Sequence, residues 1–138
     1  MTTEIPEEYR PAGTGLDLVP FHRLVSRLRH PELGCPWDKS RTLEKMAKTI
    51  REEAEETAVA LEKGDFPNQA EELGDILLNV MLAVVIAEEE GKYTWKDVMD
   101  GVSAKLIRRH PHVFGDTPAA NAEEATQMFL AAKAKEKE

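Results

Sequence analysis

Two groups of acidic residues have the types and spacing that metal chemistry requires. The motif EEAEE begins at Glu52, and the motif ELGD begins at Glu72. Residues three apart on a helix face the same way, so Glu53 pairs with Glu56 and Glu72 pairs with Asp75. Four like charges that meet at one point repel strongly, and a hard cation is the usual remedy. Mg²⁺ or Mn²⁺ takes oxygen ligands and keeps positions open for water and phosphate. The sequence therefore predicts a divalent metal site.

A solvated helix face and a di-iron site are two other interpretations of these acidic residues. Runs of Glu usually mark a solvated helix face, because Glu is a strong helix former. The matching pair on a neighbouring, mostly apolar segment disfavours this interpretation. A di-iron bundle requires Glu-x-x-His, and no histidine lies three residues after any of these carboxylates.

Helices must position the acidic groups, because hydrophobic residues recur at helical spacing and no segment reads as a convincing strand. The expected helices run from about 18 to near 31, from about 42 to 63, from near 68 to about 90, from 94 to before 111, and from 121 onward. The fold class is all-α, an antiparallel bundle of four to five helices that dimerisation completes. We expect a flexible N-terminal arm (1–15), one domain (16–116), and a C-terminal helix with a frayed charged tail (117–138).

The second and third expected helices are joined by only a few residues around Gly64, so they must be antiparallel neighbours whose carboxylates converge. On the second helix, the apolar arc includes Ile50 and Ala54 and leaves Glu53 at the edge of the core. On the third, Glu72 and Asp75 belong to a narrow polar stripe beside a segment, 76–87, that is apolar almost all the way round.

Composition limits the partners. The chain of 138 residues has a net charge of −8, which disfavours binding to nucleic-acid polymers. Cys35 is the only cysteine, so an internal disulfide and a four-cysteine zinc site are both excluded. The longest apolar run, 76–87, is shorter than the ~18 residues that span a bilayer. The N-terminal residues are unlike a secretory signal, and we expect a cytoplasmic protein without membrane contact.

Basic and aromatic residues offer further contacts for a substrate. Lys105 and Arg109 are four apart on the fourth helix and border its apolar arc, where they suit phosphate groups. The alternative is that they stabilise the C-terminus of that helix. Trp37, in a proline-containing loop, could stack on a nucleobase or anchor the loop on the core.

The order of the motifs resembles one family. EExxE at Glu52, fifteen intervening residues, and then ExxD at Glu72 is similar to the signature of the all-α nucleoside triphosphate pyrophosphohydrolases. The preceding block GCPWDK at Gly34 and the following block KLIRRHPHVFG at Lys105 resemble the MazG family in particular. The resemblance covers about residues 18–116 and, weakly, 121–124.

The resemblance implies hydrolysis of nucleoside triphosphates to the monophosphate and pyrophosphate, in homodimers or larger homo-oligomers. By similarity, Mg²⁺ would be held by Glu53, Glu56, Glu72 and Asp75. Glu53 would also act in catalysis, and Glu52 would orient water. The triphosphate would be steadied by Lys105 and Arg109, with Trp37 as a further substrate contact.

The chain departs from the family pattern in ways that bear on activity. Many members carry two copies of the domain, and this single copy resembles the first, so a catalytically weak interaction or regulatory module is the alternative function. Arg41 stands where glutamine is common, Glu55 where the residue is usually aromatic or apolar, and Phe129 where tryptophan is common. Phosphoribosyl-ATP pyrophosphohydrolase has similar acidic motifs on helices, but the CPWD and HPH blocks of this sequence argue against that enzyme.

Overall fold

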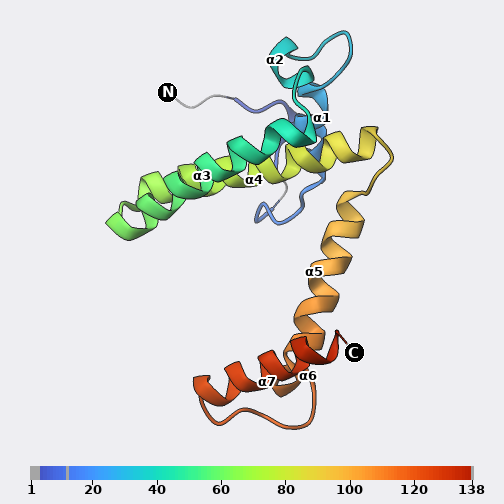
Figure 1. Cartoon of the computed structure of the whole chain (residues 1–138). Helices are drawn as coiled ribbons and strands as arrows, with labels where there is room; N and C mark the ends of the chain where they lie inside the picture. Colours follow the sequence, from blue (N-terminus) through green and yellow to red (C-terminus); the bar gives the residue numbers. More distant parts are fainter. Residues whose placement is uncertain (1–3, 12, 138) are drawn as a thin grey trace. The chain divides into compact units, whose positions relative to one another are not determined.

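The computed structural model describes residues 4–11 and 13–137, and all regular structure within these ranges is helical. The helices are η1 (Glu7–Tyr9), α1 (Val19–Leu28), α2 (Pro36–Lys39), α3 (Leu43–Lys63), α4 (Phe66–Glu89), α5 (Trp95–Arg109), α6 (Pro111–Phe114) and α7 (Ala122–Lys135) (Figure 1). The all-helical class is confirmed. None of the described helices combines the length and hydrophobicity that crossing a membrane requires.

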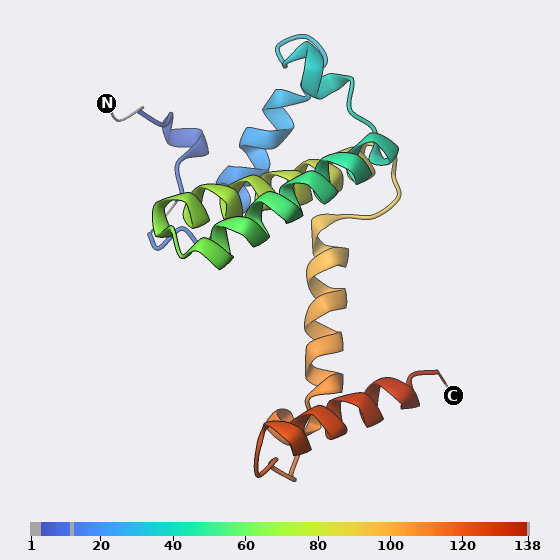
Figure 2. The same ribbon diagram turned by 60° about the vertical axis from the view of Figure 1, so that its left-hand side comes forward.

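The chain divides into two compact units, one ending at Trp95 and the other starting at Lys96. In the first unit, α3 and α4 lie side by side in opposite directions, and α1 packs against α4 (Figures 1 and 2). Its buried core consists of Val25, Met46, Met81, Leu82, Val85 and Ile86. In the second unit, α6 packs against α7. The acidic motifs both belong to the first unit.

The turn between α3 and α4 is only two residues long. Gly64 ends α3 with a φ of 67°, the left-handed conformation that glycine adopts without strain. The Asp65 carboxylate accepts the N–H of Asn68 at 3.3 Å and caps α4. Pro67 fits the first turn, where its missing N–H is not needed. The helix therefore begins at Phe66, earlier than expected, because Pro67 belongs to the first turn and does not precede it.

The buried face of α3 differs from the expected one. Met46 and Ala60 are fully buried, whereas Ile50 is 39% exposed and Ala54 is also exposed. Glu53 lies seven residues from both Met46 and Ala60, on the same stripe, and is half-buried, which agrees with its predicted place at the edge of the core. The predicted burial of Ile50 and Ala54 was wrong because α3 carries apolar residues on two faces, and only one of these faces packs into the core of this unit.

Three single-turn helices lie where the sequence predicted no helix: η1 in the expected arm, α2 in the expected loop around Trp37, and α6 just after the expected end of the fourth helix. One turn offers too few residues for a periodic signal. Two of these helices begin at a proline, Pro36 and Pro111, which suits the first helical position. On α4, residues 84–87 are buried as predicted, but Leu77 and Val80 are 37% and 36% exposed.

Candidate metal-binding site

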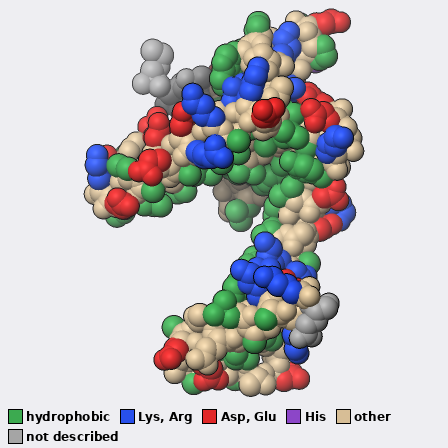
Figure 3. All heavy atoms as spheres, viewed as in Figure 1, with side chains coloured by type: hydrophobic (Ala, Val, Ile, Leu, Met, Phe, Trp, Pro, Cys, Tyr) green, Lys and Arg blue, Asp and Glu red, His purple; other side chains and the backbone are tan. Residues whose placement is uncertain are grey.

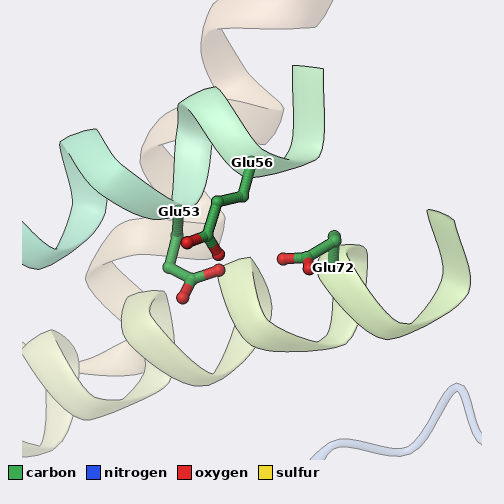
Figure 4. Close-up of side chains that lie close together, drawn as sticks. All are labelled: Glu53, Glu56 and Glu72. Atoms are coloured by element: carbon green, nitrogen blue, oxygen red, sulfur yellow. The ribbon is translucent and has the colours of Figure 1, made fainter. Parts of the chain in front are cut away.

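Three of the four acidic residues expected to meet come together between α3 and α4. Glu53 and Glu56 project from successive turns of α3, and Glu72 faces them from α4 (Figure 4). Each residue offers one carboxylate oxygen, and these three oxygens lie within 4.8 Å of one another. We call these residues the carboxylate cluster.

Two oxygens of the carboxylate cluster lack partners. The Oε2 atoms of Glu53 and Glu72 are buried, and neither has a hydrogen-bond partner among the described residues. A buried carboxylate oxygen without a partner is costly, because it has lost water and gained nothing in exchange. A hard divalent cation prefers carboxylate oxygens, and the cluster offers only this kind of donor. The donor set and its two orphaned oxygens therefore fit Mg²⁺ or Mn²⁺.

The pKa values of the carboxylate cluster also show that its negative charges are not balanced by positive ones. Burial, then the charges of Glu56, Asp75 and Glu72, together raise the pKa of Glu53 from 4.5 to about 7. The pKa of Glu72 is also raised, first by burial and then by the charge of Glu56. Without a cation, the cluster partly neutralises itself by holding a proton near neutral pH.

Thr57 holds the backbones of both helices at the carboxylate cluster. Its hydroxyl donates to the carbonyl oxygen of Glu53 at 2.8 Å and lies 3.3 Å from the carbonyl oxygen of Glu72. The side chain is buried, with 4% exposed. Helical periodicity does not show that a hydroxyl has a partner on another helix, so this role of Thr57 had no signal in the sequence.

Asp75 lies outside the set of oxygens within 4.8 Å, but its charge raises the pKa of both Glu53 and Glu72. Its backbone carbonyl accepts the side-chain amide of Asn79 at 2.8 Å, and Asn79 is buried. Asp75 as a metal ligand stays a prediction. Glu52 is exposed and lies 3.9 Å from Lys48, so its predicted role toward water also stays a prediction.

The basic residues expected to bind phosphate lie in the second unit, where Lys105 is exposed. Arg109 is engaged by Glu136: its Nη2 lies 2.9 Å from Oε2, and its Nε donates to Oε1 at 3.2 Å. The same carboxylate accepts the Nε of Arg108 at 2.6 Å. Lys and Arg side chains gather around the C-terminal end of α5 in Figure 3. Phosphate binding by Lys105 and Arg109 stays a prediction.

Trp37 does not anchor its loop on the core, which contradicts one of its two interpretations. The side chain is 59% exposed, and the guanidinium carbon of Arg41 lies 4.7 Å from the centre of its ring. In the sequence, Arg41 stands out only as a departure from the family pattern. Its contact with Trp37 had no signal in the sequence.

With this geometry in place, comparison with known proteins identifies the family. The family model described as "MazG nucleotide pyrophosphohydrolase domain" matches residues 41–114, which include the carboxylate cluster and the basic end of α5. The chain belongs to the MazG family.

Relatives of this MazG-family chain include bacterial proteins named as pyrophosphohydrolases. It is 40% identical over 114 residues to the "Nucleoside triphosphate pyrophosphohydrolase" of Escherichia coli, covering 83% of this chain and 43% of that protein. It is 41% identical over 120 residues to the "Nucleoside triphosphate pyrophosphohydrolase/pyrophosphatase MazG" of Thermotoga maritima, covering 85% and 47%. The chain thus spans less than half the length of either relative.

A solved structure shares the fold. The crystal structure of a mazG-related protein from Thermotoga maritima superimposes with a TM-score of 0.66 at 26% sequence identity. The superposition covers 81% of this chain and 97% of that protein. The helical arrangement that carries the carboxylate cluster is therefore one that a family member adopts.

Replacing Glu53 with Gln should change how stability depends on pH in metal-free buffer. The pKa of Glu53 is about 7 in the folded chain and 4.5 when unperturbed. Between these values the folded chain holds a proton that the unfolded chain has released, so the free energy of unfolding falls as pH rises. Urea unfolding between pH 4.5 and 8 with EDTA should show this fall in the wild type and a flatter profile in E53Q. The exposed Glu62→Gln, on the same helix, is the control, and equal profiles for E53Q and wild type would contradict the prediction.

Replacing Glu136 with Gln should destabilise the second unit in a pH-dependent way. Hydrogen bonds from Arg109 and Arg108 lower the pKa of Glu136 from 4.5 to about 2. The ion pairs therefore contribute stability above about pH 4.5 and lose it as the pH falls toward 2. The difference in unfolding temperature between E136Q and wild type should be largest near pH 6 and shrink below pH 4.5. Glu123→Gln removes the same charge from the first turn of α7 and should show no such dependence.

Proposed function

We propose that this chain hydrolyses nucleoside triphosphates to the nucleoside monophosphate and pyrophosphate, with Mg²⁺ as cofactor and Mn²⁺ as a substitute. The observation that carries the proposal is the carboxylate cluster, with two orphaned buried oxygens, in a chain of the MazG family. The names of the E. coli and T. maritima relatives support the reaction. Housekeeping of the cytoplasmic nucleotide pool is the role we assign to it.

The residues that would hold the metal are Glu53, Glu56 and Glu72, together with Asp75. A divalent ion bound there supplies positive charge for phosphate oxygens and lowers the pKa of a bound water. Glu53 is partly buried and has a pKa of about 7 without metal, so near neutral pH it can exchange a proton with water. Glu52, exposed on the same stretch of α3, would orient that water, a role supported only by the resemblance.

The substrate contacts in this proposal are Lys105, Arg109 and Trp37. Arg109 presents a planar guanidinium that matches phosphate oxygens as well as it matches the carboxylate it now holds. A triphosphate that binds Arg109 must therefore compete with Glu136. Trp37 is sufficiently exposed to stack on a nucleobase.

A product-resolved assay tests the reaction. Wild-type protein with Mg²⁺ and a panel of ribo- and deoxynucleoside triphosphates should release pyrophosphate and monophosphate, and EDTA should stop turnover. Glu72→Gln should lower turnover by at least about 100-fold, because altering a residue that only supports a metal ligand already costs about 10- to 100-fold. Glu62→Gln, exposed near the end of α3, should keep full activity.

Two outcomes would change the assignment. Release of orthophosphate with nucleoside diphosphate would contradict the proposal, because we assign cleavage between the α and β phosphorus atoms. A folded wild-type protein that binds Mg²⁺ but turns over none of the triphosphates would favour the second candidate, a catalytically weak helical interaction module. The resemblance to the first of two family copies is the observation that keeps this candidate open.

We also propose that the chain forms a homodimer or larger homo-oligomer through α3 and α4. Apolar residues on these helices recur at i, i+4 and i+7 or i+11 and remain 36–51% exposed: Ile50, Leu61, Leu73, Leu77 and Val80. Residues at this spacing share one helix face, so each helix presents an uncovered apolar stripe. Hydrophobic side chains gather along one side of the α3–α4 pair in Figure 3.

Replacing Leu77 with Asp should dissociate the oligomer, because a charge would lie in the contact. Sedimentation velocity should show the wild type above the monomer mass of 15.5 kDa and L77D at that mass. The matched control is Leu33→Asp in the loop before α2, which should leave the oligomer intact. A wild-type monomer at micromolar concentration would contradict the proposal.

A further inference from the structure

Arg41 joins the exposed ring of Trp37 to helix α3. Its guanidinium carbon lies 4.7 Å from the centre of the indole ring, a cation–π distance. Its Nη2 donates to the backbone carbonyl of Lys45 at 3.1 Å and also to the hydroxyl of Thr49. The arginine therefore contacts the indole ring and is hydrogen-bonded to helix α3 at the same time.

The contact with Thr49 places this pair close to the carboxylate cluster. Thr49 and Glu53 are four residues apart, so they lie on the same face of α3, ~6 Å apart along the helix axis. Both belong to the first unit. The guanidinium of Arg41 is thus about one helical turn from the residue at the centre of the cluster.

A second arginine makes the segment that carries Trp37 rigid. The Nη1 of Arg29 donates to the carbonyls of Asp38 at 2.5 Å and of Arg41 at 3.1 Å. Its Nε and Nη2 bind the carboxylate of Glu89 at the end of α4. The backbone on both sides of the Trp37–Arg41 contact is therefore tied to α1 and α4 before any ligand arrives.

Both side chains of the pair keep surface or donor atoms that the described protein residues do not contact. Trp37 is 59% exposed although it is a large aromatic residue. The Nε of Arg41 is buried and has no acceptor within the part of the chain that the structure describes. An exposed aromatic ring held in place beside a cation is a surface on which a nucleobase stacks, whatever its identity, because every base has a π-face.

We propose that Arg41 is a positioning residue that holds Trp37 as the stacking surface for the nucleobase of the substrate. The inference rests on the proposed function, since it assumes that the triphosphate meets the carboxylate cluster. For Trp37 to meet the base while the phosphates are at the cluster, the sugar must extend toward the N-terminal end of α3, where the Trp37–Arg41 pair lies. Arg41 then acts on the nucleoside end of the substrate through the ring of Trp37 and leaves the phosphate end unaffected.

Binding measurements separate the two ends of the substrate without requiring turnover. The probes are an α,β-methylene nucleoside triphosphate, which is not cleaved at the assigned bond, and inorganic tripolyphosphate, both titrated by calorimetry with Mg²⁺. Trp37→Leu should weaken the nucleotide analogue about tenfold and leave tripolyphosphate within twofold, because stacking on one base is lost. Arg41→Gln should weaken the analogue about three- to tenfold, again with tripolyphosphate unchanged.

A double-mutant cycle tests whether Arg41 acts through Trp37. Adding Arg41→Gln to Trp37→Leu should cause no further loss, because the ring that Arg41 holds is already gone. Arg51→Gln is the matched control: it removes one positive charge from α3, two residues after Thr49 and thus on the opposite face, and should bind both probes as the wild type does. Circular dichroism checks the fold, and Arg41→Lys, which keeps the charge, carries the test if R41Q is unfolded.

Three outcomes would overturn the inference. R41Q could bind the analogue as tightly as wild type, it could lose tripolyphosphate as strongly as the analogue, or its loss could add fully to that of W37L. The second outcome would make Arg41 a phosphate contact, and the third would make it independent of Trp37. A wild-type protein that binds neither probe would instead contradict the proposed function itself.

Discussion

The first unit depends on one constraint: carboxylates occupy a stripe that helix packing buries. Glu53 lies seven residues from Met46 and from Ala60, so the packing that buries these two side chains also removes part of Glu53 from water and leaves it half-buried. The two-residue turn at Gly64 then brings Glu72 to the same place from α4. Hydrophobic packing alone would exclude such groups, since buried like charges repel and lose hydration. A fold that retains them needs compensation: in the metal-free chain a proton held near neutral pH supplies part of it, and a divalent cation at the two orphaned oxygens would supply more.

The elements of this site could be predicted from the sequence, but their rotation could not. The spacing of Glu53, Glu56 and Glu72 and the short link predicted two antiparallel helices with facing acids, and the structure brings these three together. The predicted rotation of α3 about its own axis was wrong. Ile50 and Ala54 were expected on the core face, but both lie on an exposed surface. Periodicity counts apolar residues and cannot tell a core face from a face that another molecule covers.

Contacts between side chains distant in the sequence could not be predicted either. Thr57 looks like any small residue on an apolar face, yet its hydroxyl reaches the backbone of both helices at the cluster. Arg41 looks like a substitution in a loop, yet it spans from Trp37 to α3. Such contacts depend on where two elements lie in space, and a single sequence carries no signal for that. They concern how the acids and Trp37 are positioned, whereas the acids themselves follow from spacing.

Charge is distributed differently in the two units. The carboxylate cluster of the first unit would attract a metal ion and repel a triphosphate. In the second unit Arg108 and Arg109 both bind one carboxylate, Glu136. A carboxylate and a phosphate present similar pairs of oxygens to a guanidinium, so Glu136 occupies the donors that a phosphate would need. If a phosphate binds Arg109 as we propose, the contact that stabilises the second unit sets the free-energy cost that the phosphate must exceed.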